Sequence, residues 1–132
     1  MRVASRCMGD RLFSVDEARG LMPAVRRHAT ELVHARADLA ELSRELRAEG
    51  HSRLGGLPEA KALDARLGEL LGWFPAQGLE VKGLAPLLLD FPAELDGVSV
   101  RLCWLEGEPK LGWYHRSDLG IIGRRRLPAG PA

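Results

Sequence analysis

Side chains that could carry chemistry gather in the second half of the chain. Five of them are oxygen or imidazole donors near expected strand ends and turns: Asp90, Glu106, Glu108, His115 and Asp118. Such donors can surround a divalent cation, because carboxylate oxygens and imidazole nitrogens are common metal ligands. The pair His115 and Asp118 is the first candidate. A His-x-x-Asp pair also occurs often by chance, and a single histidine ending an apolar strand face is usually a satisfied core or rim residue.

A second histidine, His28, occupies a seam position of the first predicted helix. If the sheet packs on this helix, His28 and His115 approach each other or share Glu31 or Asp118 as a partner. Two imidazoles beside a carboxylate can bind a metal or exchange a proton near neutral pH. The predicted metal ligands are therefore His28, His115 and Asp118, and the identity of the divalent metal stays open. The alternative is that His28 is a polar seam residue that fixes register.

The segment Gly120–Arg126 combines flexible glycines with three arginines. This composition can hold a phosphate or a carboxylate. The segment is not a P-loop, because the Lys-Ser/Thr ending is absent and Pro128 follows where a helix is needed. The alternative is a solvated tail or ion pairs with the first helix. The predicted ligand-binding residues are Asp90, Glu108, Trp113, His115, Asp118 and Arg124.

Cysteine catalysis depends on how the strands around Cys103 pair. In the predicted hairpin Val100 lies opposite His115 and Leu102 opposite Trp113, so Cys103 points away from the imidazole. A register that differs by one residue would reverse this and bring the thiol to the face of His115. No Gly-x-Ser-x-Gly motif supports a serine nucleophile.

Helical signals fill the first half of the chain. Ser14 and Glu17 form a capping box that starts a helix, and Pro23 is expected to interrupt or kink it near residues 20–22. From residue 23 to 49 apolar residues recur every seven positions, a spacing typical of a coiled-coil seam. Glycines around residues 50–57 reverse the chain, and a second apolar stripe predicts an antiparallel helix over residues 59–74.

The second half of the chain changes to the alternation typical of strands. Residues 79–83 and 87–91 are short candidate strands. Residues 98–105 and 110–115 form the clearest hairpin, with a turn centred on Gly107 and Glu108. One face of this hairpin is expected to pack on the first helix. That face carries Val98, Val100, Leu102, Trp104, Leu111, Trp113 and His115.

Composition bounds the class of protein. The chain has 132 residues, of which 19 are basic and 18 acidic, for a formal net charge of +1. This balance argues against a dedicated nucleic-acid binder or membrane-surface protein. No apolar run reaches the roughly 18 residues of a membrane span, and no secretory signal is recognised, so a cytoplasmic protein is expected. Cys7 and Cys103 belong to no C-x-x-C pair, so no disulfide is expected.

These signals together predict an α+β fold in a single domain over residues 1–132. A helical hairpin with a kinked long first helix over residues 14–76 is followed by a small antiparallel sheet over residues 79–127. Residues 1–10 and 128–132 are expected to be tails, and either Met1 or Met8 is the natural start. The first predicted helix is longer than the second, so part of its apolar seam is not buried by the second helix. A second copy of the chain would bury it, and a homodimer through helix 15–49 is therefore expected.

Several short strings of this sequence occur together in one known family. They are Phe13–Ala18, Leu21–Pro23, Leu89–Ala93, Leu102–Trp104, Gly107–Glu108, Trp113–His115, Asp118 and Gly123–Arg124. Over residues 12–127 the chain thereby resembles a bacterial family labelled domain of unknown function 2203. The resemblance implies no established activity, substrate or cofactor. The chain departs from the family pattern at Leu84–Pro86, where an acidic residue is usual, and at Gly120–Gly123, where an aromatic residue is usual.

Three functional hypotheses follow from these residues. The first, which we prefer slightly, is a non-enzymatic homodimeric interaction or scaffolding protein whose helical hairpin recruits a protein partner. The second is a metal- or small-anion-binding module centred on His115 and Asp118. The third is a metal-dependent hydrolase that uses the same residues, and it requires a cleft at His115 rather than a flat sheet face.

Overall fold

The computed structural model describes residues 11–128 and forms two compact units. The first unit contains the chain up to Val25 and again from Phe74 onward, and the second is Arg26–Trp73. The expected tails 1–10 and 129–132, the choice between Met1 and Met8, and Cys7 lie outside the described residues. The elements are two helices followed by a five-stranded sheet, so the predicted α+β class is confirmed.

Helix α1 spans Val15–Glu49. The predicted capping box is confirmed, because the Ser14 amide donates to Glu17 Oε1 at 2.8 Å and the Glu17 amide donates to Ser14 Oγ at 3.0 Å. The helix continues through Pro23 without a break, although proline supplies no amide donor. Met22 and Val25, on either side of Pro23, are buried, and tertiary packing contributes more to the stability of a helix in a protein than local propensity does. The interruption expected at Pro23 is therefore absent, while a bend at this point stays a prediction.

Helix α2 spans Leu57–Ala76 and forms an antiparallel hairpin with the later part of α1. Two contacts between the helices show the direction, because His28 meets Trp73 and Glu31 meets Arg66. Near the turn, Glu45 bonds to Ser52 of the connecting segment. The predicted helix 59–74 is thus confirmed and extends slightly further at both ends. Within residues 11–128, neither helix is long and apolar enough to cross a membrane.

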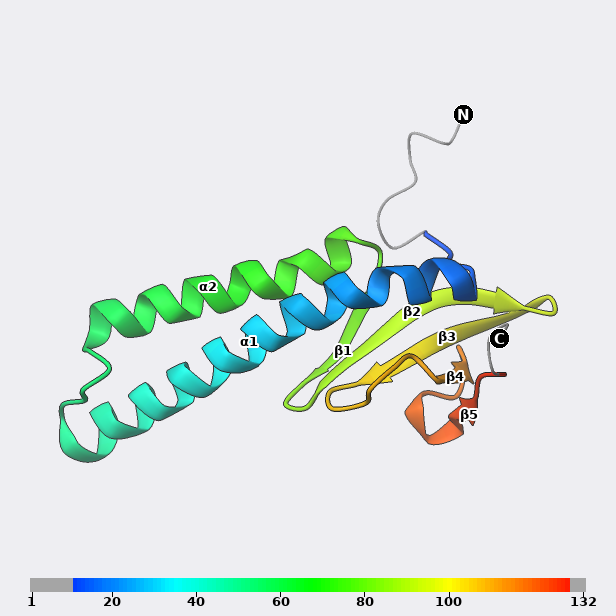
Figure 1. Cartoon of the computed structure of the whole chain (residues 1–132). Helices are drawn as coiled ribbons and strands as arrows, with labels where there is room; N and C mark the ends of the chain where they lie inside the picture. Colours follow the sequence, from blue (N-terminus) through cyan, green and yellow to red (C-terminus); the bar gives the residue numbers. More distant parts are fainter. Residues whose placement is uncertain (1–10, 129–132) are drawn as a thin grey trace. The chain divides into compact units, whose positions relative to one another are not determined.

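The sheet follows the helices and is antiparallel throughout, with its strands in chain order (Figure 1). Its second strand runs to Leu95 rather than ending at residue 91. Asp96 and Gly97 make the turn that follows, with φ of 52° and 78°, a pair typical of tight two-residue hairpins. The strands are β1 (Glu80–Leu84), β2 (Leu87–Leu95), β3 (Val98–Leu105), β4 (Trp113–Arg116) and β5 (Arg125–Arg126).

The predicted register between β3 and β4 is wrong by one residue. Arg101 lies opposite His115, and Cys103 lies opposite Trp113. The error arises because the turn covers residues 105–108, closed by a hydrogen bond from the Glu108 amide to the Leu105 carbonyl at 2.9 Å, and is not centred on Gly107 and Glu108 as expected. Residues 109–112 then lengthen the connection before β4. Since side chains alternate along a strand, the shift moves Trp113 and His115 to the face that carries Cys103.

The core of the first unit lies on the other face of the sheet. Val100, Leu102 and Trp104 are buried there, as predicted, whereas Val98, expected on the same packed face, is 44% exposed at the start of β3. Phe13, which precedes α1, meets Phe91 of β2 edge-on with ring centroids 5.2 Å apart. Further buried residues of this unit are Ala18, Met22, Val25, Leu87, Leu89 and Ala93. Because apolar side chains fill this face, the opposite face is available for polar groups.

Candidate metal centre

Three buried side chains with metal-binding atoms meet on the polar face of the sheet. Asp90 of β2 lies opposite Cys103 of β3, and His115 comes from the neighbouring strand β4. One ligand atom of each residue lies within 4.8 Å of the other two. Asp90 and His115 are each 3% exposed, and Cys103 is fully buried. Burial of ionisable groups costs free energy unless they are paired or bind an ion, so this cluster is the candidate functional site.

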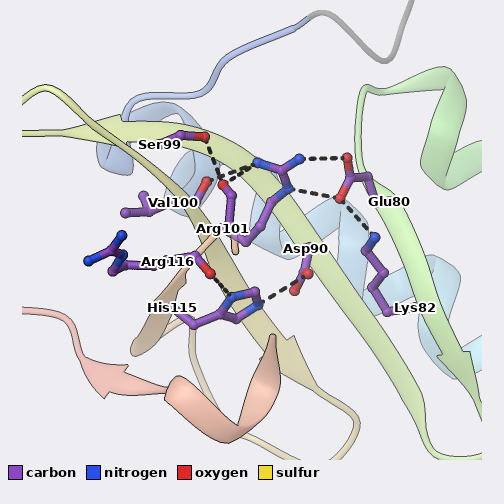
Figure 2. Close-up of polar contacts among 9 residues, drawn as sticks. Glu80, Lys82, Asp90, Ser99, Val100, Arg101, His115 and Arg116 are labelled. Carbon is purple, nitrogen blue, oxygen red and sulfur yellow. Dashed lines mark hydrogen bonds and ion pairs between the residues drawn. The ribbon is translucent and has the colours of Figure 1, made fainter. Parts of the chain in front are cut away.

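The imidazole of His115 is held at both nitrogens (Figure 2). Its Nδ1 lies 2.7 Å from the backbone carbonyl oxygen of Arg116, and its Nε2 lies 3.3 Å from Oδ2 of Asp90. A carbonyl oxygen can only accept a hydrogen bond, so Nδ1 carries the proton and a neutral ring presents the Nε2 lone pair to Asp90. The Nε2 lone pair and the ionised carboxylate of Asp90 are both acceptors, so this contact is favourable only if a proton or a metal ion lies between Nε2 and Oδ2. Metal-binding histidines commonly donate their second ring N–H to a backbone carbonyl in this way.

The carboxyl group of Asp90 has an unused ligand atom. Its Oδ1 is buried and has no hydrogen-bond partner among the described residues, although most buried polar atoms have one. In a tetrahedral zinc site with bonds of roughly 2.0–2.1 Å, oxygen and nitrogen ligands lie roughly 3.3 Å apart. Oδ2 of Asp90 and Nε2 of His115 have this separation, 3.3 Å. This separation is equally that of the hydrogen bond between the two atoms, so the feature that points to a metal ion is the unpartnered Oδ1.

Burial shifts the pKa of two members of the cluster. It raises the pKa of Asp90, an effect that the charge of His115 opposes. Burial, reinforced by the negative charge of Asp90, raises the pKa of Cys103 to about 12. The metal-free thiol is thus protonated and is a poor nucleophile, which argues against cysteine catalysis. A bound cation would reverse this preference and favour the ionised ligands.

A network of charged side chains borders the cluster (Figure 2). Arg101 donates from Nε and Nη2 to Glu80 at 2.9 and 3.3 Å, and from Nη1 to Ser117 Oγ at 2.7 Å. The ammonium of Lys82 lies 3.4 Å from Glu80 Oε1. Burial acts to raise the pKa of Glu80, but the hydrogen bonds and charge of Arg101 outweigh it and the pKa is lowered. Glu80 is therefore an ionised carboxylate that holds Arg101 in place.

A cavity of about 320 Å³ lies beside the cluster, and we call it the Lys82 cavity. It supplies the cleft at His115 that the hydrolase hypothesis requires. A larger cavity of about 560 Å³ is lined by Val100 and Tyr114 on the other face, but no buried ionisable side chain lines it. The smaller cavity is the functional candidate for that reason. Its lining residues are Lys82, Leu88, Asp90, Arg101, His115, Ser117, Gly120 and Ile121.

The structure brings together two of the predicted metal or ligand residues, Asp90 and His115. Asp118 stands apart from them, because its exposed carboxylate pairs with Arg116 at 3.0 Å. His28 belongs to the helical unit, where its ring stacks on that of Trp73 with centroids 3.7 Å apart. The predicted metal set of His28, His115 and Asp118 thus differs from the cluster that the described residues form.

The remaining predicted ligand residues form a group of their own. Arg124 Nη2 lies 2.5 Å from Glu108 Oε2, and its guanidinium sits over the ring of Trp113 at 4.6 Å from the centroid. These charges therefore compensate each other. Glu106, also singled out from the sequence, accepts a hydrogen bond from the Leu87 amide at 2.8 Å.

Sequence reasoning misses Cys103 as a member of the site. The error is the register error, because the predicted pairing turns the thiol away from His115, whereas the observed pairing puts Cys103 and His115 on one face. The alternative that the sequence left open, a register that differs by one residue, is the pairing observed. Local residue types between β3 and β4 do not distinguish the two registers, so only the folded sheet identifies the thiol.

Comparison with known proteins gives a family but no function. A family model described as an uncharacterized conserved protein (DUF2203) matches residues 11–127. No curated protein and no solved structure matches the chain. The matched region includes Asp90, Cys103 and His115 together with the whole sheet. The resemblance noted in the sequence is confirmed, and the chain belongs to the DUF2203 family.

Proposed function

We propose that the protein binds one divalent transition-metal ion, Zn²⁺, through Asp90, Cys103 and His115. The observation that carries this proposal is the buried, unpartnered Oδ1 of Asp90 beside a thiol and an imidazole. A mixed oxygen, nitrogen and sulfur set suits zinc, which accepts all three ligand types. It does not suit Ca²⁺ or Mg²⁺, which take oxygen ligands.

The contacts around the cluster also support zinc binding. The Arg116 carbonyl fixes the His115 ring with Nε2 toward Asp90, and such outer contacts usually accompany metal-binding histidines. The three ligands come from three adjacent antiparallel strands, so backbone hydrogen bonds hold their spacing. A site built on strands is positioned more accurately than one built on a loop.

The test is zinc binding by the full chain and four variants. Elemental analysis of protein purified without chelator should find one zinc per chain, and competition with a colorimetric chelator should give its affinity. Cys103→Ala and Asp90→Asn should lose binding, with circular dichroism confirming that each variant folds. Asp118→Asn and His28→Gln are matched controls that should bind zinc normally. Unchanged affinity in Cys103→Ala, or loss only in the two controls, would overturn the proposal.

We also propose a second, non-enzymatic role, self-association of the chain through α1. Leu39 and Leu46 occupy the seam of this helix and are only partly buried, whereas the nearby Leu42 is fully buried. A second copy of the helix would cover these two leucines and bury further apolar area. Light scattering coupled to size exclusion should show a dimer that Leu39→Asp or Leu46→Asp dissociates, while His115→Ala leaves it intact. A wild-type monomer at all concentrations would rule out this role.

A further inference from the structure

The proposed zinc site is one ligand short of a closed structural site. Structural zinc is held by four protein ligands, whereas catalytic zinc keeps three and leaves one position for water or substrate. Among the described residues, the cluster contains three ligand atoms, from Asp90, Cys103 and His115. A fourth ligand must therefore come from outside the cluster.

The Lys82 cavity is the place from which that ligand can arrive. Asp90 and His115, two of the three proposed ligands, line the cavity, so an ion that they hold has access to it. Its volume, about 320 Å³, lies at the lower end of the roughly 300–1,000 Å³ typical of ligand pockets. The fourth ligand is thus a small molecule or ion rather than a polymer.

Charge around the Lys82 cavity favours an anion. A Zn²⁺ ion with an ionised carboxylate and thiolate carries no net charge, and Glu80 neutralises Arg101 through two hydrogen bonds. Arg101 has further contacts with Ser117 and the Val100 carbonyl, which commit its donors. Glu80 is also the ion-pair partner of Lys82, so one carboxylate faces two cations and the group of Glu80, Lys82 and Arg101 keeps one net positive charge. The Lys82 ammonium has three donors and one acceptor partner, Glu80, among the described residues, and it is half exposed.

We infer that the Lys82 cavity binds a small oxyanion, a phosphate or carboxylate group, as the fourth ligand of the metal, with Lys82 pairing to its remaining oxygens. This inference rests on the proposed metal site. It places the protein among those that present a metal to a small anionic substrate or ligand, since metal ions and lysines together stabilise phosphoryl and carboxylate charge. Arg101 also lines the cavity and holds Ser117, another lining residue, through a hydrogen bond of 2.7 Å.

Cobalt substitution separates the two proposals in one experiment. Co²⁺ is added to the metal-free full chain, and the visible spectrum reports both the sulfur-to-cobalt charge-transfer band and the coordination geometry of the ion. Inorganic phosphate is then titrated into the cobalt protein. We expect the charge-transfer band to form when Co²⁺ alone is added. The ligand-field bands should then change as phosphate is added, until the phosphate site is saturated.

Two lysine variants test the role of the cavity. Lys82→Gln should bind Co²⁺ as tightly as the wild type but bind phosphate at least 10-fold more weakly. Lys110→Gln changes an exposed lysine outside the cavity and should leave both affinities unchanged. Absence of the charge-transfer band would refute the metal site itself. A normal band with no response to phosphate, or an equal phosphate response in Lys82→Gln, would refute the oxyanion inference and leave the metal site standing.

Discussion

His115 Nε2 and Asp90 Oδ2 lie 3.3 Å apart while the other ring nitrogen of His115 is committed to the Arg116 carbonyl. This relationship fixes the chemistry of the pair. With its proton on Nδ1, the imidazole can meet an ionised Asp90 only through a shared proton or a metal ion. In the metal-free chain a proton shared between the two groups satisfies this contact, and a bound cation would take the place of that proton.

Asp90→Asn should change stability and metal affinity in opposite directions. The side-chain amide of asparagine can donate to the His115 Nε2 lone pair, so the metal-free variant should gain roughly 1 kcal/mol in unfolding free energy. Loss of the anionic ligand should weaken zinc binding by more than roughly 100-fold. Urea unfolding with chelator present and zinc competition measure the two effects. A variant that is both less stable and unaltered in zinc affinity would argue for a purely structural pair.

Glu80→Gln should remove stability that depends on pH. Contacts with Arg101 lower the pKa of Glu80 from its ordinary value of 4.5, so its stabilising effect is complete above that value and is lost as the pH falls through the folded-state pKa. At pH 7 the variant should be less stable by roughly 2 kcal/mol. This difference should shrink as the pH is lowered below 4.5. Urea unfolding of both chains from pH 7 to pH 3 measures it, and a difference independent of pH would contradict the assignment.

Glu108→Gln should destabilise the protein far more than removal of an exposed pair. The carboxylate of Glu108 and the guanidinium of Arg124 are 21% and 15% exposed, and losing one partner of such a pair costs roughly 3 kcal/mol. Asp118→Asn removes the partner of Arg116, where both side chains are more than half exposed. That control should cost less than roughly 1 kcal/mol. Thermal unfolding of the two variants gives the comparison, and equal losses would show that burial does not matter here.

Ser14→Ala should weaken the start of α1. The Ser14 hydroxyl accepts the Glu17 amide at 3.0 Å, and removing such a cap costs roughly 1 kcal/mol. Ser14→Asp retains an acceptor at the same position and should keep wild-type stability. Thermal unfolding distinguishes the two. Equal stability of all three chains would show that the cap contributes nothing to the folded state.

Much of the fold was predictable because its signals are local. The capping box begins α1 at the predicted residue, the seven-residue spacing gives a long helix, and alternation identifies β3 correctly over residues 98–105. A signal that was present but not used is Asp96–Gly97, the turn that extends β2 to Leu95. Pro23 is the opposite case, since its local effect is outweighed by packing that local sequence does not show.

By itself the sequence determined the residue types that can bind a metal, the helical hairpin and the presence of a small antiparallel sheet after it. Only the tertiary structure decided that Cys103 and His115 share a face, and that Asp90 joins them rather than Asp118. The physical reason is that side chains alternate along a strand, so one residue of register moves every side chain to the opposite face. That register depends on the path of residues 106–112 and on packing across the whole sheet, and neither is written in a local pattern.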